Sequence, residues 1–234
     1  MKYYLQNDHI SIVVDTFGAY IDSLKYKGES VFFNKTVIDD EGRSLDRGGC
    51  HICYPQFSSG DKFGLEKHGF GRKLEWGVID NSESHIILEL TKATGDYEKL
   101  LTKLFYTLDG NKIVMKLLVS NKGDGKVALA PAFHPYFEIG DANEVLLDGE
   151  VLDLNDETLI DTWYKNNVKN LKTDKYEVEF EQKNLSVYAL WTDRMGSYFC
   201  AEPTHSSISF TKDEGYIMID PGSTREFVFE MKIK

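Results

Sequence analysis

Alternation of apolar and polar residues is the clearest pattern along the chain. Between residues 112 and 120, Ile113, Met115, Leu117 and Val119 recur at every second position. A period of two is the signature of a β-strand, because successive side chains of a strand point to opposite faces. The other face of this segment is also partly apolar, which predicts that a second layer covers it.

Similar short runs, bounded by glycine, asparagine and aspartate turns, predict strands along most of the chain. Asp109-Gly110-Asn111 is expected to form a hairpin turn. Residues 34–49 and 58–77 are aperiodic and are expected to be loops, and residues 156–170 are expected to hold a short helix or a long loop. The predicted strands cover residues 10–14, 17–26, 31–33, 85–90, 100–108, 112–120, 126–137, 176–181, 185–191, 197–201, 207–210, 216–219 and 226–233.

Many short strands, frequent hairpin turns and the lack of an amphipathic helix predict an all-β fold. The composition does not change along the chain, so we expect a single domain over residues 1–234. Packed antiparallel sheets, forming a β-sandwich, are the expected architecture. All-β domains of this length are common.

Charge and apolar content exclude some classes of function. The formal net charge of -11 argues against a general affinity for nucleic acid or an anionic membrane, because phosphates require a basic surface. No apolar stretch is long enough to span a bilayer, and residues 1–8 lack the apolar core of a signal peptide. We therefore expect a cytoplasmic protein without nucleic-acid or membrane partners.

The three cysteines do not suggest a disulfide framework. Cys50-His51-Ile52-Cys53 has the spacing of a metal knuckle or a redox pair. A zinc site needs a second pair of ligands, however, and only Cys200 and scattered histidines remain. We expect no metal site, and cysteines that serve as small buried apolar residues.

One histidine stands near the end of an apolar run, in the segment Pro131-Ala132-Phe133-His134-Pro135-Tyr136-Phe137. A histidine titrates near neutral pH and can give a proton to a substrate oxygen. The following proline restricts the backbone, and the two aromatic rings offer flat apolar faces. This combination suits a sugar-binding acid. The alternative is a core histidine whose nitrogens are hydrogen-bonded to the backbone.

Three further segments place polar side chains in loops or at strand ends. Glycines in two of them allow the backbone to approach a ligand closely. Each polar residue also has an ordinary structural role as an alternative, either as a solvated carboxylate or as a salt-bridge partner. The segments are Arg47-Gly48-Gly49, His68-Gly69-Phe70-Gly71-Arg72 and Cys200-Ala201-Glu202-Pro203.

The order and amino-acid sequences of these four segments resemble motifs of the aldose 1-epimerase (galactose mutarotase-like) superfamily. The resemblance is strongest to its branch of hexose-6-phosphate mutarotases and short bacterial aldose epimerases, and it extends from Arg47 to the Asp220-Pro221-Gly222-Ser223 turn. It implies a large antiparallel β-sandwich, the galactose mutarotase-like supersandwich, with an open cleft for a sugar. The implied activity is the interconversion of α and β anomers without a cofactor.

The resemblance also implies roles for individual residues. His134 matches the general acid of the family, and Glu202 matches its general base. Arg47 and His68 match substrate-binding positions, and Arg72 matches the arginine that closes the HGFxR motif. The implied partner is a small-molecule sugar, and no metal or cofactor is expected.

The chemistry of anomer exchange suits these residue types independently. A base removes the O1 proton while an acid protonates the ring oxygen, so the ring opens, the C1–C2 bond rotates and the ring closes as the other anomer. The reaction requires two groups of tunable pKa, which we expect on opposite sides of the ring, and needs neither metal nor nucleotide.

Two arginines can hold either a phosphate or sugar hydroxyls, so a free hexose and a hexose 6-phosphate are both candidate substrates. We favour a free hexose, because arginines that also bind the sugar are thin evidence for phosphate. A non-catalytic carbohydrate-binding domain and a structural β-domain are the competing hypotheses, since one fold can host several functions. Only the epimerase requires His134 and Glu202 to face one cavity.

Overall fold

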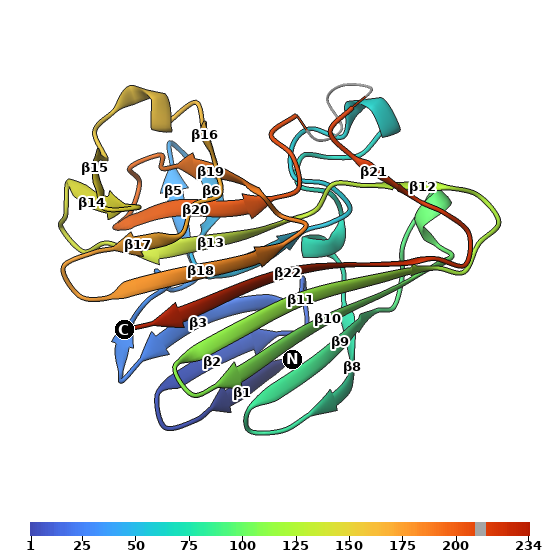
Figure 1. The fold of residues 1–234 in the computed structure, drawn as a ribbon, viewed down its shortest axis with the longest axis horizontal. Helices are drawn as coiled ribbons and strands as arrows, with labels where there is room; N and C mark the ends of the chain where they lie inside the picture. Colours follow the sequence, from blue (N-terminus) through green and yellow to red (C-terminus); the bar gives the residue numbers. More distant parts are fainter. Residues whose placement is uncertain (209–213) are drawn as a thin grey trace.

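The computed structural model describes residues 1–208 and 214–234, and its regular structure is almost entirely β (Figure 1). Two nine-stranded sheets with antiparallel pairing form the body of the molecule. One large cluster of buried side chains joins them, as in a sandwich. The predicted all-β fold of packed antiparallel sheets is therefore confirmed.

The first sheet carries strands from both halves of the chain. Its order is β1 (Lys2–Gln6), β2 (Ile10–Asp15), β3 (Tyr20–Tyr26), β7 (Cys50–Cys53), β13 (Ala132–Glu138), β20 (Tyr198–Thr204), β19 (Val187–Trp191) and β16 (Trp163–Asn166), with β4 (Glu29–Ser30) paired to β3.

The second sheet is built around the long central hairpin. Its order is β15 (Glu150–Asp153), β14 (Glu144–Leu147), β17 (Asn170–Lys172), β18 (Glu177–Lys183), β22 (Thr224–Ile233), β11 (Lys112–Asn121), β10 (Leu100–Asp109), β9 (His85–Leu90) and β8 (Trp76–Asn81).

Two small sheets and four short 3₁₀-helices complete the described elements. The small sheets pair β12 (Val127–Leu129) with β21 (Ile217–Ile219), and β5 (Thr36–Asp40) with β6 (Arg43–Arg47). The 3₁₀-helices are η1 (Asp61–Phe63), η2 (Gly71–Lys73), η3 (Gly95–Tyr97) and η4 (Glu157–Leu159). Within the described residues no helix is long and apolar enough to cross a membrane.

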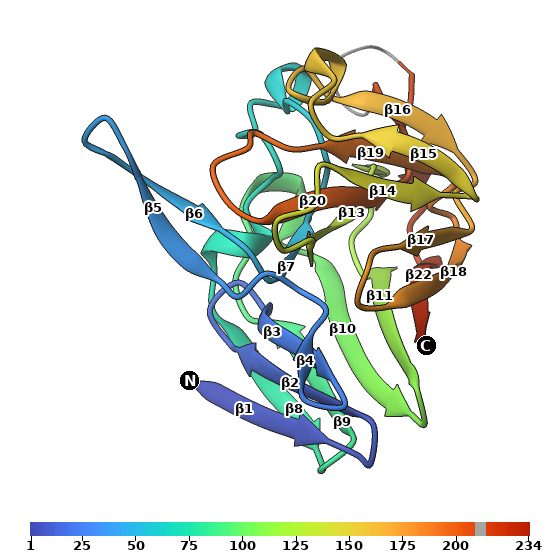
Figure 2. The ribbon, with the colours of Figure 1, turned by 90° about the vertical axis from the view of Figure 1, so that its left-hand side faces the viewer.

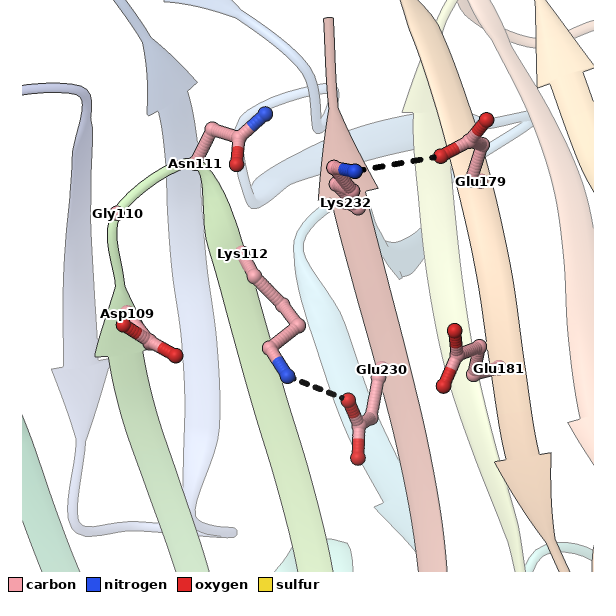
Figure 3. Close-up of a pocket in the computed structure, with 8 residues that line it drawn as sticks. All are labelled: Asp109, Gly110, Asn111, Lys112, Glu179, Glu181, Glu230 and Lys232. Carbon is pink, nitrogen blue, oxygen red and sulfur yellow. Dashed lines mark hydrogen bonds and ion pairs between the residues drawn. The ribbon is translucent and has the colours of Figure 1, made fainter.

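Strand β11 shows how the sequence pattern sets the core. Ile113, Met115, Leu117 and Val119 are fully buried, as their alternation predicts. The expected second layer over the opposite face is wrong. Charged side chains of neighbouring strands cover this face instead, and Figure 3 shows Lys112 bound to Glu230 across a shallow surface hollow.

Several predicted boundaries are wrong. Residues 34–49 are not a loop, because they contain the hairpin β5–β6, which projects from the body in Figure 2. Residues 126–137 form two strands, β12 and β13, separated at Ala130 and Pro131. Of the predicted strand 207–210, residues 207 and 208 are not in a strand and the other two lie outside the described residues.

Candidate active site

Strand β13 sorts the residues of the aromatic heptapeptide onto two faces. Phe133 and Phe137 are buried in the core between the sheets. His134 and Tyr136, at alternate positions, point to the other face, where both line a cavity. Period-two geometry therefore separates the aromatic residues that brace the strand from the one that faces the cavity.

His134 and Glu202 lie opposite each other on neighbouring strands. The pairing of Ala132 with Thr204 and of Tyr136 with Cys200 places them in register between β13 and β20. Nε2 of His134 lies 3.2 Å from Oε2 of Glu202, although the two atoms are not aligned for a hydrogen bond. Both side chains are almost completely buried. The structure thus places an imidazole and a carboxyl group in contact at the base of one cavity.

The cavity above this pair has a volume of about 260 Å³. The end of β6, the segment between β7 and β8, strands β13, β19 and β20 and the loop before β16 all contribute to its wall. Polar and charged side chains predominate, and three aromatic rings lie among them. The lining residues are Asp46, Arg47, Phe57, Lys67, His68, Arg72, His134, Tyr136, Thr162, Trp191 and Glu202.

Burial governs the protonation of the pair. It raises the pKa of Glu202 well above its ordinary value, while the charge of Lys67 acts in the opposite direction. Burial also lowers the pKa of His134 well below its ordinary value, and the nearby imidazoles of His51 and His68 lower it further. The free site therefore favours a carboxylic acid beside a neutral imidazole, so the pair holds one transferable proton.

Aromatic rings hold His134 in place from several sides. Its ring stacks on Tyr136, with centroids 4.8 Å apart, and on His51, with centroids 4.5 Å apart. Trp191 and His68 meet it edge-on. Such packing restricts the imidazole to one orientation, as an acid or base in a fixed position requires.

His68 enters the cavity on a loop that depends on glycine. Its own φ is +67°, and Gly69 follows with a φ of +66°. A Cβ atom on Gly69 would lie 2.1 Å from the carbonyl oxygen of Tyr54, so no other residue fits there without a shift of the backbone. Burial, with the charges of Arg72 and Lys67, lowers the pKa of His68 to about 3. His68 is therefore neutral at the cavity wall.

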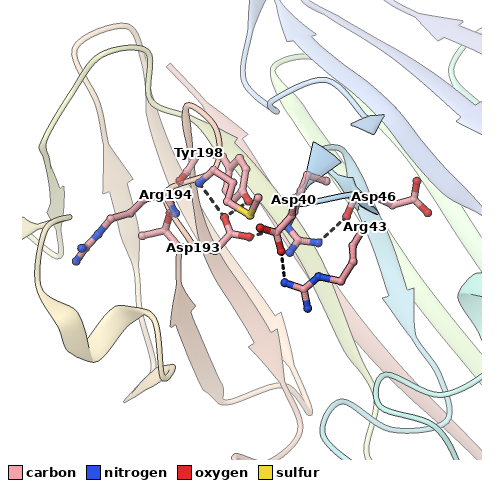
Figure 4. A network of polar contacts seen from close by, with 9 residues as sticks. Asp40, Arg43, Asp46, Asp193, Arg194 and Tyr198 are labelled. Atoms are coloured by element: carbon pink, nitrogen blue, oxygen red, sulfur yellow. Dashed lines mark hydrogen bonds and ion pairs between the residues drawn. The ribbon is translucent and has the colours of Figure 1, made fainter. Parts of the chain in front are cut away.

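Arg47 is held at the cavity by an acidic partner from a distant part of the chain. Its Nε atom donates to Oδ2 of Asp193 over 2.8 Å, and the guanidinium carbon lies 5.5 Å from the ring centroid of Trp191. The hydroxyl of Tyr198 donates to the other oxygen of Asp193, and Figure 4 shows these two residues facing the β5–β6 hairpin. Arg47 is thus positioned, and its charge is largely compensated.

Arg72 and Lys67 carry uncompensated charge. Within residues 1–208 and 214–234 neither side chain forms an ion pair. The guanidinium of Arg72 donates from Nη2 to the carbonyl oxygen of Lys67 over 3.4 Å, and its buried Nε has no partner. Two free cations at one wall make that side of the cavity attractive to an anionic group.

Residues 1–216 match the family model for aldose 1-epimerase. The chain belongs to the aldose 1-epimerase family. A relative from Salmonella typhimurium, provisionally named a glucose-6-phosphate 1-epimerase, is 29% identical over 137 residues. That match covers 56% of this chain and 46% of the relative, so it spans less than half of the relative's length.

Solved structures confirm the fold of this aldose 1-epimerase family member. A galactose mutarotase related enzyme from Lactobacillus acidophilus superimposes with a TM-score of 0.81 at 18% identity, covering 100% of this chain and 97% of the other. A galactose mutarotase-like protein from Lactobacillus casei also gives a TM-score of 0.81, at 13% identity and with full coverage of both chains. The expected galactose mutarotase-like sandwich is therefore present.

In this family member, all five of the site residues predicted from the sequence line the one cavity. They are His134, Glu202, Arg47, His68 and Arg72. The acid and base were expected on opposite sides of a sugar ring, whereas the structure places the two groups next to each other. O1 and the ring oxygen are both bonded to C1, so adjacent groups can reach both.

Several residues of the site carry no signal in the sequence. Lys67 and Asp46 precede motif residues, but nothing in their local pattern distinguishes them from surface charges. Asp193 acts through a contact with a residue 146 positions away. Thr162, in the loop before β16, also lines the cavity without a distinguishing local pattern.

The Cys50–Cys53 pair does not form a metal or redox site. Cys50 belongs to the core between the sheets, whereas Cys53 packs with Phe57 and Ala132 in a separate cluster. Residues three apart in a strand point to opposite faces, so the two sulfur atoms cannot bind the same ion. All three cysteines are free and buried.

Proposed function

We propose that the protein is an aldose 1-epimerase, which interconverts the α and β anomers of a hexose by acid/base-catalysed ring opening and reclosure. The observation that carries this proposal is the contact between the buried imidazole of His134 and the carboxyl group of Glu202 at the base of the cavity. Anomer exchange requires one proton donor and one proton acceptor at neighbouring oxygens, and this pair supplies both.

The two groups exchange roles in the course of one turnover. Glu202, as the base, accepts the O1 proton while His134, as the acid, gives a proton to the ring oxygen, and the C1–O bond of the ring breaks. After rotation about the C1–C2 bond, His134 removes the hydroxyl proton and Glu202 returns a proton to the carbonyl oxygen. No proton is gained or lost over the cycle, and each group is worth ~10²–10⁴ in rate.

The resting pair must first pass its proton from Glu202 to His134. Burial favours the neutral pair in the free protein. A sugar hydroxyl that donates a hydrogen bond to Glu202 favours its ionised form, and so moves the proton to the imidazole. Substrate binding thereby produces the base and the acid together.

Arg47, His68 and Trp191 are proposed to bind the sugar. Arg47 is already oriented by Asp193 and Trp191, so little side-chain entropy is lost when it donates to hydroxyls. His68 is neutral and can both donate and accept a hydrogen bond. The exposed part of the Trp191 ring offers an apolar surface for the C–H groups of a pyranose.

A hexose 6-phosphate is the second candidate substrate. The unpaired charges of Lys67 and Arg72 favour it, because a phosphate would compensate both. The provisional names of the relatives from Salmonella typhimurium and Escherichia coli point in the same direction.

Exchange NMR between the α and β anomers of glucose, galactose and glucose 6-phosphate tests the proposal. We expect native protein to accelerate exchange of at least one sugar, and Glu202→Gln to reduce that acceleration by ~10²–10⁴. Binding without acceleration would assign the cavity to a non-catalytic carbohydrate-binding domain. Full activity of the variant would contradict the proposed mechanism.

A pair of variants separates the two substrates. Arg72→Met removes an unpaired cation at the cavity, whereas Lys73→Met removes the neighbouring exposed cation, which pairs with Glu66 outside the cavity. If the substrate is phosphorylated, only Arg72→Met raises KM, and it does so for glucose 6-phosphate far more than for glucose. Equal effects on both sugars would assign Arg72 to the hydroxyls.

A further inference from the structure

Cys200 lies beside the acid/base pair and has no part in the proposed reaction. It precedes Glu202 by two positions on β20, so both side chains point to the cavity face of the sheet. Tyr136 and Trp191 are its cross-strand neighbours on the two sides. The thiol does not itself line the cavity; it lies behind the lining, packed with Tyr136 and close to the reacting groups.

One nitrogen, one sulfur and one oxygen ligand atom converge at this point. The ligand atoms of His134, Cys200 and Glu202 all lie within 4.8 Å of one another, and this is the one such trio of His, Cys, Asp and Glu side chains in the described part of the chain. Imidazole, thiolate and carboxylate are the ligands that zinc takes in proteins.

We propose that His134, Cys200 and Glu202 form a binding site for Zn²⁺, and that the bound ion inhibits the enzyme. The inhibition rests on the proposed function, whereas the binding of the ion does not. Zinc acts here as an inhibitor that takes over the reacting groups, and it has no part in the anomer exchange itself.

The geometry fits a three-ligand site with one open position. A tetrahedral zinc ion holds its ligand atoms roughly 3.5 Å from one another, given bonds of about 2.0–2.3 Å. His134 and Glu202 are already 3.2 Å apart, so movement of the Cys200 side chain by about 1 Å completes the trio. The fourth position is left for a water molecule.

The charges of the ligand set also suit the ion. Zinc binds a neutral imidazole, a thiolate and a carboxylate, and protons held by the thiol or the carboxyl group are released on binding. Two anionic ligands then surround a dication. The complete site therefore carries no net charge, which keeps the electrostatic cost low.

An unsatisfied polar atom gives a second reason for a ligand here. Oε2 of Glu202 is buried without a hydrogen-bond partner. This oxygen lies next to Nε2 of His134 and is free to coordinate an ion. The unpaired cations of Lys67 and Arg72 oppose its entry, and the carboxylate of Asp46 at the mouth favours it.

Inhibition follows directly from the ligand set. An ion bound to His134 and Glu202 occupies the lone pairs that must accept and pass protons. We expect exchange to stop at saturating Zn²⁺, to recover on addition of a chelator, and to be protected by high sugar concentration, because sugar and ion occupy the same cavity floor.

The test measures zinc binding by isothermal titration calorimetry on protein without an affinity tag, in parallel with the anomer-exchange rate. We expect one Zn²⁺ per native chain, and an affinity lower by about 100-fold or more in Cys200→Ala, since loss of a ligand exceeds the 10–100-fold cost of losing an outer-shell contact. Cys53→Ala, which removes another buried thiol outside the trio, serves as the control and is expected to bind as the native chain does.

Two results would overturn the proposal: no binding of Zn²⁺ to native protein, or equal affinity in native protein and Cys200→Ala. Circular dichroism of both variants shows whether they are folded, and each rate is compared with the metal-free rate of the same variant. Zinc binding that depends on Cys200 in a protein without epimerase activity would support the metal site and contradict the proposed function. The experiment therefore distinguishes failure of the metal site from failure of the proposed function.

Discussion

Replacement of His51 by leucine is expected to make the protein more stable and less sensitive to acid. The ring of His51 lies between Tyr20 and His134, with centroids 5.3 and 4.5 Å away. Both of its nitrogens are buried and neither has a hydrogen-bond partner. Burial lowers its pKa well below the ordinary value, and the positive charge of Arg72 lowers it further.

The expected gain in the free energy of unfolding has two parts. At about pH 7.5 the imidazole is neutral in both the folded and the unfolded chain, and a buried unsatisfied polar group costs about 1–3 kcal/mol. Below pH ~6.5 the unfolded chain binds a proton at His51 that the folded chain does not, so native stability falls by about 1.4 kcal/mol per pH unit from this group. The loss continues until the pH reaches the lowered pKa of the folded state. His51→Leu removes both parts.

Urea unfolding at several pH values, followed by the fluorescence of the buried Trp76, measures the difference. We expect His51→Leu to be more stable than native protein by about 1–3 kcal/mol at pH ~7.5, with a gap that widens by about 1.4 kcal/mol per pH unit between pH ~6.5 and pH ~5. His9→Leu, at an exposed position, is the control and should show no widening gap. A gap that stays constant or narrows on acidification would refute the reasoning.

Two further substitutions test how the site is positioned. Gly69→Ala should destabilise the fold by more than about 3 kcal/mol, because strain at positive φ adds to a clash with the Tyr54 carbonyl. Gly64 has a similar φ but open space around it, so Gly64→Ala should cost only about 1–2 kcal/mol. Equal losses of stability in urea unfolding would contradict the role of the close approach. Asp193→Asn removes the charged partner of Arg47, so KM for the sugar should rise several-fold with little change in kcat. A selective loss of kcat in exchange kinetics would instead place Asp193 in the chemical step.

The sequence predicts some strands better than others, for a physical reason. In β10 and β11 one face is buried and the other is not, so the strands alternate and the Asp109 to Lys112 turn closes them in register. Strand β7 is buried on both faces, so its four residues show no alternation. Hairpin β5–β6 is hard to predict for the opposite reason. Few of its side chains are buried, so its sequence pattern resembles that of a loop.

The residues of the site also fall into those that the sequence predicts and those that it does not. His134, Glu202, Arg47, His68 and Arg72 were identified because motifs of a family carry them, and all five line the cavity. Their neighbours depend on contacts between distant segments. The cross-strand pairing that brings His51 against His134 and the ion pair of Arg47 arise only when the sheets form, so no local pattern could identify them.

The central claim is that His134 and Glu202 act as one proton-transferring unit. The direct test is the anomer-exchange rate of Glu202→Gln, His134→Asn and the double variant, with circular dichroism to show that each is folded. We predict that each single substitution lowers kcat by ~10²–10⁴ and that the double variant is no slower than the slower single one, because either change disables the unit. Multiplication of the two losses in the double variant, or a native rate in either single variant, would contradict the claim.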